Sequence, residues 1–400
     1  MNKKISIATV IVLIALSVLI TYQLTYIKVD NKYNIALSEI KDHQLVYEKL
    51  AEVDEVYRKQ YIGQIDDSVL IDTMIKGYVE GTGDTYGEYY TKQEYEELLR
   101  GNNSEYVGIG IQYIYNETED AIEVVEVIQN SSAEEAGIMI GDMIVRVGDK
   151  TVKELGFDGA LSEIRGEEKT FADITIERKD ELTELHIERR KVTDYTVFPR
   201  LYTADNSIGI IRITEFGSDT VQQFKNAVKE LLEKGADKLV LDVRNNLGGD
   251  LGAICEILDY LVPKGTLVRI YDKSGRVSAL ESDASSVELP MVVITNRYTS
   301  GVAELFACTL RDHNKAVLVG EKTYGKGSMQ TILPFDNGTA LRVTTSLYAP
   351  PVTENYDGIG IEPDVQISLP EELRTKSIYL LTDEEDTQLT AAVKTFDKTN

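Results

Sequence analysis

The stretch that decides the fold is "MVVITNRYTSGVAELFACTLRD", Met291–Asp312. Five apolar and β-branched residues indicate a buried strand, a short polar segment follows, and apolar residues then recur at helical spacing. A strand that passes through a tight turn into a helix is where many hydrolases place a nucleophilic hydroxyl. This turn offers Thr299 and Ser300, followed by Gly301.

The same alternation surrounds this stretch from Lys191 onward. The segments "SIGIIRI" and "KLVLDVR" indicate strands, whereas "TVQQFKNAVKELLEKG" and "GAICEILDYLV" indicate helices. Strand–helix–strand order predicts an α/β layer that includes parallel neighbours. From about Tyr106 to Arg190, short alternating strands such as "AIEVVEVI" predict a separate β-rich module, in which "SSAEEAGI" and "FDGALSEIR" form two short helices.

Residues 33–101 have a helical pattern, which glycines and Asp84 interrupt near residue 83. Such a segment can pair with a second copy of the chain, giving a homodimer through this region. It can equally pack on the body of its own chain. The pattern is compatible with both arrangements.

A membrane anchor is indicated at the N-terminus. The run "ISIATVIVLIALSVLITY", Ile5–Tyr22, carries no charge, and as a helix it is about 27 Å long, close to the thickness of a bilayer core. No small-x-small cleavage motif follows, which favours an uncleaved signal-anchor over a cleaved signal peptide. With Lys3 and Lys4 held inside, a single-pass protein of the cell membrane would carry the remainder of its chain outside the cytoplasm.

Charge and composition exclude several classes of function. A net charge of −25 disfavours nucleic acid as a partner, because phosphate would be repelled. Cys255 and Cys308 lie in apolar helical patterns and are expected to be small buried side chains. The three histidines show no metal-ligand spacing. We therefore expect neither a metal nor a cofactor.

The β-rich module resembles a bacterial PDZ domain. The resemblance rests on "YVGIGI", on "SSAEEAGIMIGDMIVRVGDKTV" and on "IRG" at Ile164–Gly166, in this order, and a generic small β domain is the alternative. Open backbone N–H groups near two glycines suit a terminal carboxylate, beside which an extended peptide can add as a strand. The expected ligands are proteins or peptides with free, apolar C-termini. The expected peptide-binding residues are Gly108, Ile109, Gly110 and Ile111.

From about Tyr47 to the C-terminal helix, the chain resembles the carboxyl-terminal processing peptidases. The resemblance is carried by "GDTYGEYYTKQEYEEL", "KLVLDVRNNLGGDL", "TNRYTSGVAELF", "VLVGEKTYGKGSMQ", "DGIGIEPDV" and "DTQLTAAV". It implies a serine endopeptidase with a Ser–Lys dyad, and an α/β multidomain fold with a PDZ domain set into a crotonase-like catalytic core. The expected parts are the anchor (1–32), the helical N-terminal region (33–101), the PDZ domain (102–191), the peptidase core (192–370) and the C-terminal helix and tail (371–400).

The resemblance also assigns roles to single residues. Lys326 in "TYGKGSMQ" corresponds to the base, and Gln330 to the residue that holds its amine. A lysine has an ordinary pKa of about 10.4, so it must be desolvated to act as a base near neutral pH. The loop "VRNNLGG" supplies the oxyanion donor through the backbone of Gly248 or Gly249. Arg244 is expected to brace this loop.

The nucleophile departs from the family pattern. In the family it stands three residues before the glutamate that opens the next helix; here that glutamate is Glu304, and position 301 holds glycine. Counting back from Lys326 also leads to Gly301. Ser300 stands one residue early, which moves a side chain by about 3.5 Å and changes its direction. Two hypotheses follow: Ser300 attacks through an altered turn, or the chain is an inactive pseudoprotease that binds C-termini or regulates a partner.

Overall fold

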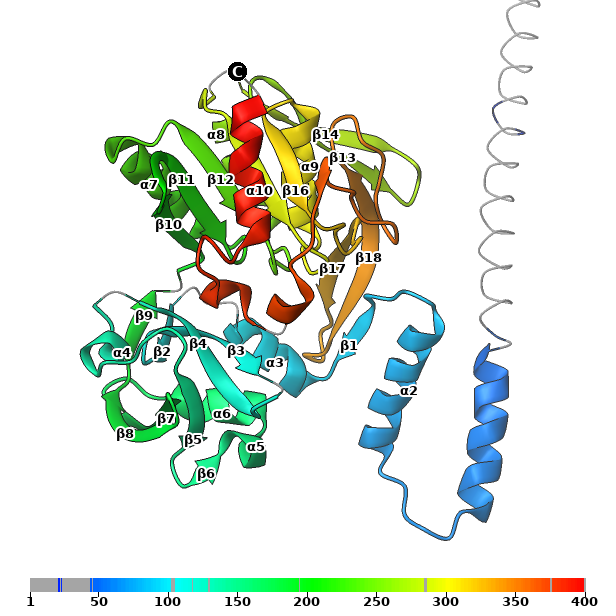
Figure 1. Cartoon of the computed structure of the whole chain (residues 1–400). Coiled ribbons are helices and arrows are strands. Elements are labelled where there is room, and N and C mark those ends of the chain that lie inside the picture. The colour runs from blue at the N-terminus through cyan, green and yellow to red at the C-terminus, as the bar shows by residue number, and fades with distance from the viewer. Residues whose placement is uncertain are drawn as a thin grey trace, which may run out of the picture. The chain divides into compact units, whose positions relative to one another are not determined.

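The computed structural model describes residues 21, 23, 44 and 46–398, apart from 102–104, 117, 129, 194, 284–285 and 375 (Figure 1). The expected anchor, residues 5–22, lies outside the described residues except for Thr21. Within the described ranges, no helix is long and apolar enough to cross a membrane. The chain divides into two compact units, Met1–Gly77 and Tyr78–Asn400.

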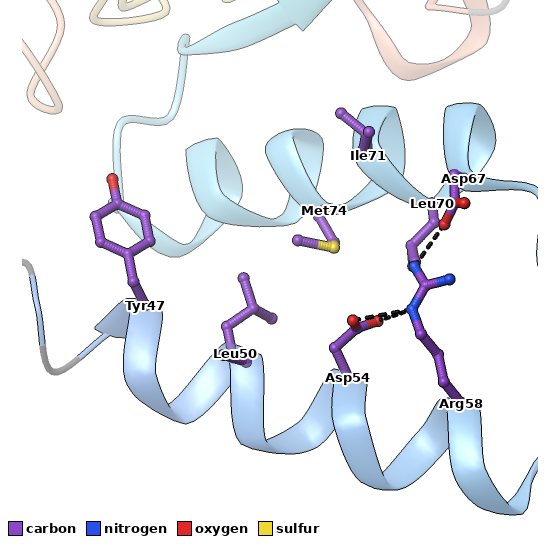
Figure 2. A pocket seen from close by; sticks show the side chains of 9 residues that line it. Tyr47, Leu50, Asp54, Arg58, Asp67, Leu70, Ile71 and Met74 are labelled. Carbon is purple, nitrogen blue, oxygen red and sulfur yellow. Dashed lines mark hydrogen bonds and ion pairs between the residues drawn. The ribbon is translucent and has the colours of Figure 1, made fainter.

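The first unit contains a helix of residues 46–60 and most of a second helix, α2 (Asp67–Gly81). The Arg58 guanidinium lies 2.8 Å from a carboxylate oxygen of Asp54 and 2.5 Å from one of Asp67, so it bridges the two helices (Figure 2). Beside this pair is a cleft of about 610 Å³, lined mainly by apolar side chains: Tyr47, Leu50, Ala51, Leu70, Ile71 and Met74.

Apolar side chains also cover the outside of these helices. Val53, Val56, Tyr57 and Val69 are each more than half exposed. An amphipathic helix normally buries such a stripe against another surface. The homodimer through this region stays a prediction.

The β-rich module has a hydrophobic core of its own. Its main sheet has the order β3-β4-β5-β7-β8, with β6 paired to β5, and β2 pairs separately with β9. The two helices that the sequence predicts are confirmed as α4 (Ser132–Glu135) and α6 (Phe157–Ile164). The other elements are β2 (Glu105–Gly108), β3 (Ile111–Asn116), β4 (Ala121–Val127), β5 (Met143–Val147), β6 (Lys150–Thr151), α5 (Val152–Leu155), β7 (Phe171–Arg178), β8 (Glu181–Glu188) and β9 (Arg190–Thr193).

The predicted α/β layer is a six-stranded sheet of order β10-β11-β12-β15-β16-β19. All neighbours from β11 to β19 are parallel, and β10 is antiparallel to β11. Parallel order requires crossover connections, which helices supply here. The elements are β10 (Val197–Tyr202), β11 (Asp205–Ile213), α7 (Thr220–Glu233), β12 (Lys238–Asp242), α8 (Leu251–Leu261), β15 (Met291–Thr295), α9 (Val302–Asp312), β16 (Ala316–Gly320), β19 (Val365–Gln366) and α10 (Thr387–Thr395).

Helices cover both faces of this sheet. Successive side chains of a strand point to opposite faces. Leu239 and Leu241 of β12 therefore share a core with α7, α8 and α9, whereas Val240 packs in a second core with α10, drawn in red in Figure 1. A sheet buried on both faces explains why its strands are almost wholly apolar.

A second sheet has the order β1-β18-β13-β14, with β17 also paired to β18. Its bounds are β1 (Glu88–Tyr90), β13 (Gly265–Asp272), β14 (Val277–Ser282), β17 (Ser328–Pro334) and β18 (Ala340–Ala349). Strand β1 falls inside the region predicted to be helical, which resumes with α3 (Lys92–Gly101). Tyr89 and Tyr90 are buried in this strand, and pairing with β18 outweighs the local helical pattern.

Candidate active site

The tight turn lies between Thr295, where β15 ends, and Val302, where α9 begins. Gly301 is the N-cap of α9, with φ 65° and ψ −129°. This is the conformation of the first central residue of a type II′ turn, which glycine adopts without strain. The preceding amide, of Ser300, donates to the Asn246 carbonyl at 2.9 Å. The turn is therefore attached to the loop that follows β12.

The two aliphatic hydroxyls of the turn, on Thr299 and Ser300, differ in their hydrogen bonds. Thr299 is fully buried, and its hydroxyl donates to the Val243 carbonyl at 2.9 Å while accepting from the Asn296 amide. Its hydroxyl is thus engaged in holding the turn. Ser300 is 6% exposed. Of these two aliphatic hydroxyls, Thr299 is the one that holds the turn, and the role of Ser300 as nucleophile stays a prediction.

The space beside Gly301 can hold a small side chain. A Cβ atom placed on this residue would lie 3.3 Å from the Leu247 carbonyl oxygen and 3.8 Å from both the Gly248 Cα and the Tyr348 hydroxyl. The first distance is tight, and the others are ordinary van der Waals contacts. A side chain here is opposed mainly by the positive φ, which costs a non-glycine residue about 1–3 kcal/mol.

The glycine loop after β12 packs against the turn. A Cβ on Gly248 would lie 3.2 Å from both the Ser300 carbonyl oxygen and the Val302 nitrogen. The Gly248 amide, however, donates to the Asn246 side chain at 2.8 Å, so it is occupied in this structure. Gly249 lies opposite Phe216 in an isolated β-bridge. The two hydrogen bonds of this bridge join Phe216 to the Gly248 carbonyl and to the Asp250 amide, so they do not use the Gly249 amide. The oxyanion role of Gly248 or Gly249 stays a prediction.

Lys326 lies in the loop between β16 and β17. Its ammonium lies 4.5 Å from the centre of the Tyr86 ring. Burial lowers the pKa of the Lys326 amine, the Arg342 guanidinium lowers it further, and the Asp357 carboxylate opposes both. Desolvation is what the resemblance requires of a lysine base.

Gln330 does not contact the Lys326 amine in this structure. Its amide nitrogen donates to the hydroxyls of Ser328 and Thr344, each at 3.2 Å. Within the described part of the chain, the Lys326 ammonium forms no hydrogen bond. The predicted roles of Lys326 and Gln330 stay predictions.

Glu304 joins the turn to the lysine loop. One of its carboxylate oxygens accepts the amides of Gly301 at 2.9 Å and Lys326 at 2.8 Å. The other accepts the Thr323 hydroxyl at 2.5 Å and the Gly325 amide at 2.7 Å. Burial raises the pKa of the Glu304 carboxyl, although these hydrogen bonds oppose the rise. A single buried carboxylate thus places the backbone of residue 301 beside the backbone of Lys326.

Two tyrosines support the same pair of segments from their carbonyl sides. The Tyr356 hydroxyl donates to the Gly301 carbonyl, and the Tyr348 hydroxyl donates to the Lys326 carbonyl, each at 2.9 Å. Burial raises the pKa of both phenols, so they stay protonated and continue to donate. The turn and the lysine loop are therefore each held at a carbonyl group, in addition to the amide groups that Glu304 holds.

Arg244 joins the end of β12 to the C-terminal helix, and its expected role in bracing the glycine loop stays a prediction. Its guanidinium lies 2.6 Å from an Asp242 oxygen and 2.7 Å from an Asp386 oxygen, and all three side chains are at least nine-tenths buried. It also donates to Gln388 at 3.0 Å. Asp386 is the N-cap of α10, so this ion network attaches the C-terminal helix to the end of β12.

The expected peptide-binding residues adopt different local structures. Gly108 ends β2 and pairs with Arg190, so "GIGI" is not one continuous strand. Ile109 and Gly110 form the link into β3, and their carbonyls accept the amides of Ala133 and Ile128. Gly110 has φ 89°, and a Cβ there would lie 2.3 Å from Ser131. β3, which starts at Ile111, is the edge strand of its sheet.

The two cysteines carry free thiols. Cys308 is fully buried, as expected, whereas Cys255 is only partly buried. Burial raises the pKa of each thiol to about 11, so both are protonated at neutral pH. Among the residues that the structure describes, no group of three or more metal-ligating side chains occurs.

Some members of the site were missed by sequence reasoning. In the sequence, Glu304 only located the expected position of the nucleophile. Its place as the third residue of a helix is the usual signal of a capping box, and this signal could have indicated its contact with the turn. Asn246 and Tyr86 lie inside family-like motifs, but nothing in their spacing indicates what they contact. Their partners are set by tertiary packing.

Several known proteins are similar to this chain in sequence. Peptidase family S41 matches residues 207–367. A "Probable CtpA-like serine protease" of Staphylococcus aureus (strain N315) is 31% identical, covering 82% of this chain and 66% of that protein. "Carboxy-terminal processing protease CtpA" of Bacillus subtilis (strain 168) is 30% identical, covering 81% and 70%. The chain thus spans just under two thirds of the length of the Staphylococcus relative.

The fold agrees as well. The solved photosystem II D1 C-terminal processing protease is 26% identical, with a TM-score of 0.51, over 84% of this chain and 91% of that one. The mixed α/β multidomain architecture is therefore shared with that protease. This chain belongs to peptidase family S41, among the CtpA-like carboxyl-terminal processing serine proteases.

Proposed function

We propose that the protein acts on other proteins at their carboxyl termini as a serine-type processing endopeptidase. The observation that carries this proposal is the bridge through Glu304, which joins the strand-to-helix turn to the loop of Lys326. A base must lie next to its nucleophile, and this bridge brings the two segments together. Ser300 supplies the hydroxyl, Lys326 the base, and Gly249 or Gly248 the oxyanion donor.

The chemistry follows that of Ser–Lys enzymes. The neutral Lys326 amine takes the hydroxyl proton as the oxygen attacks the scissile carbonyl. Backbone N–H groups stabilise the tetrahedral anion, each contributing about 3 kcal/mol. The ammonium then protonates the leaving amine, and water releases the acyl group. Because only the neutral amine is a base, the rate rises with pH through the pKa of Lys326, which burial has lowered.

A second candidate is a binding protein that does not cleave. The observation that favours it is Gly301, which occupies the family position of the nucleophile without a hydroxyl. Incubation of the full chain with an unstructured protein, followed by mass spectrometry, separates the two candidates. Cleavage that Ser300→Ala abolishes assigns Ser300 as the nucleophile. No cleavage by the parent chain, or cleavage that Ser300→Ala leaves unchanged, rejects Ser300.

The β-rich module acts in this proposal as a PDZ domain that selects free C-termini. Its support is the edge strand β3, beside which an extended peptide can pair. A peptide with a free apolar C-terminus should bind about tenfold or more tightly than its C-terminal amide, because hydrogen bonds to a carboxylate are worth about 1.5–3 kcal/mol. Fluorescence anisotropy measures both affinities. Equal affinities would remove the carboxylate-binding assignment.

The same proposal places the body of the protein outside the cell membrane, tethered by residues 5–22. Its support is the uncharged run that follows Lys3 and Lys4. A tag at Asn400 should then be digested when protease is added to intact cells. A tag that stays protected while a known external marker is cut would show that the topology is wrong.

A further inference from the structure

A short segment before the β-rich module, Asp84–Tyr90, runs along β18; we call it the strap. The Asp84 carboxylate accepts the Thr344 amide at 2.8 Å and the Thr344 hydroxyl at 2.7 Å. Arg342 donates to the Tyr86 carbonyl at 3.0 Å and pairs with Glu88 at 2.6 Å. These four contacts, from Asp84 to Glu88, hold the strap against the strand on both sides of Tyr86.

Lys326, the expected base, contacts this strap, and Gln330, which is expected to hold the amine of Lys326, contacts Thr344, to which the strap is attached. The Lys326 ammonium lies over the face of the Tyr86 ring, 4.5 Å from its centre. Gln330 donates to the same Thr344 hydroxyl that donates to Asp84. Lys326 and Gln330 are therefore each held by a separate partner, and neither contacts the other.

Several charged and polar groups surround the Lys326 side chain. Arg342 of β18 disfavours its positive charge, whereas Asp357 of the loop before β19 favours it. Tyr348 engages only the Lys326 carbonyl, and Glu304 only its amide. Among the residues that the structure describes, the Tyr86 ring is the aromatic face over which the Lys326 ammonium lies. A ring face attracts a cation, by about 0.5–1 kcal/mol where water has access.

We infer that Tyr86 is a positioning residue: its ring holds the Lys326 ammonium in a resting place, and Lys326 acts as a base only after its amine leaves this ring. The assignment of Lys326 as base rests on the proposed function. The contact with Tyr86 does not.

The test measures the ionisation of Lys326 in the full chain. Competitive acetylation with acetic anhydride is carried out from about pH 6 to about pH 11, a range that brackets the pKa of an ordinary lysine. Mass spectrometry of the peptide that contains Lys326 then gives the apparent pKa of its amine. Tyr86→Leu keeps an apolar cover but removes the ring face, so the unprotonated fraction below the pKa should rise about two- to fivefold. Tyr86→Phe is the matched control and should equal the parent.

Three results would overturn the inference. Equal ionisation in parent, Leu and Phe variants would show that the ring does not hold the ammonium. A Phe variant that behaves like Leu would assign the effect to the hydroxyl. A raised pKa in the Leu variant would show that the ring acts only by excluding water. Urea denaturation checks that Tyr86→Leu is folded, and Tyr86→Met replaces it otherwise.

A second measurement links the contact to catalysis. In a Gly301→Ser background, Tyr86→Leu should move the acid limb of the kcat profile to lower pH and leave KM unchanged, which a loss of folding would not do. An unmoved profile in an active Gly301→Ser enzyme would overturn the positioning role. If the parent chain and Gly301→Ser are both inactive, the proposed function has failed, and the acetylation experiment still decides whether Tyr86 holds Lys326.

Discussion

Where the parent chain does not cleave through Ser300, Gly301→Ser should raise the rate of protein cleavage by about a thousandfold or more. A serine at this residue would place a hydroxyl on the turn, where the Glu304 bridge, the glycine loop and Lys326 are already assembled. Loss of a single member of such an assembly costs about three to six powers of ten in kcat, so its return should be unmistakable. Cleavage of an unstructured protein, followed over time, measures the gain.

Gly301→Ala is the matched control for this variant. It introduces the same Cβ and the same backbone strain without a hydroxyl, so both variants should lose about 1–3 kcal/mol of stability, and only the serine should gain activity. A folded Gly301→Ser protein with no more activity than Gly301→Ala would contradict the expectation. It would show that the chain lacks more than a hydroxyl at residue 301.

The second large effect is expected on stability. Arg244→Met should lower the free energy of unfolding by about 3–5 kcal/mol, because it leaves the buried carboxylates of Asp242 and Asp386 without their counter-charge. Urea denaturation measures the loss. Lys234→Met is the control, because its pair with Glu230 is about half exposed, and such pairs contribute about 0–1 kcal/mol. A loss below that of the control would reject a stabilising role for the network.

The effect of Arg244→Met should also depend on pH. The Arg244 guanidinium holds the pKa of the Asp242 carboxyl below its ordinary value, against the opposing effect of burial. A carboxylate with a lowered pKa contributes stability above its unfolded pKa and loses it as the pH falls through the folded pKa. The difference between parent and variant should therefore be full at neutral pH and shrink in acid. A difference that stays constant into acid would show that the ion pair is not its source.

Several features of this protein could be predicted from short-range patterns. Alternating strands and helices after Lys191 predicted the α/β layer, because a buried strand and an amphipathic helix each leave a period within ten or so residues. The same kind of pattern failed at Glu88–Tyr90, where pairing with β18 makes a strand of residues expected to be helical. Strand pairing across 250 residues of chain leaves no local period.

The sequence by itself determined that residue 301 has no side chain, that the available hydroxyl lies one residue earlier, and that a lysine follows at the family spacing. Only the tertiary structure decided what these residues contact. Glu304 meets the Lys326 loop, Tyr86 meets the Lys326 ammonium, and Asp386 meets Arg244. Each of these partners comes from another segment of the chain. A buried charge takes the partner that packing brings to it, and that choice depends on the whole fold and not on neighbouring residues.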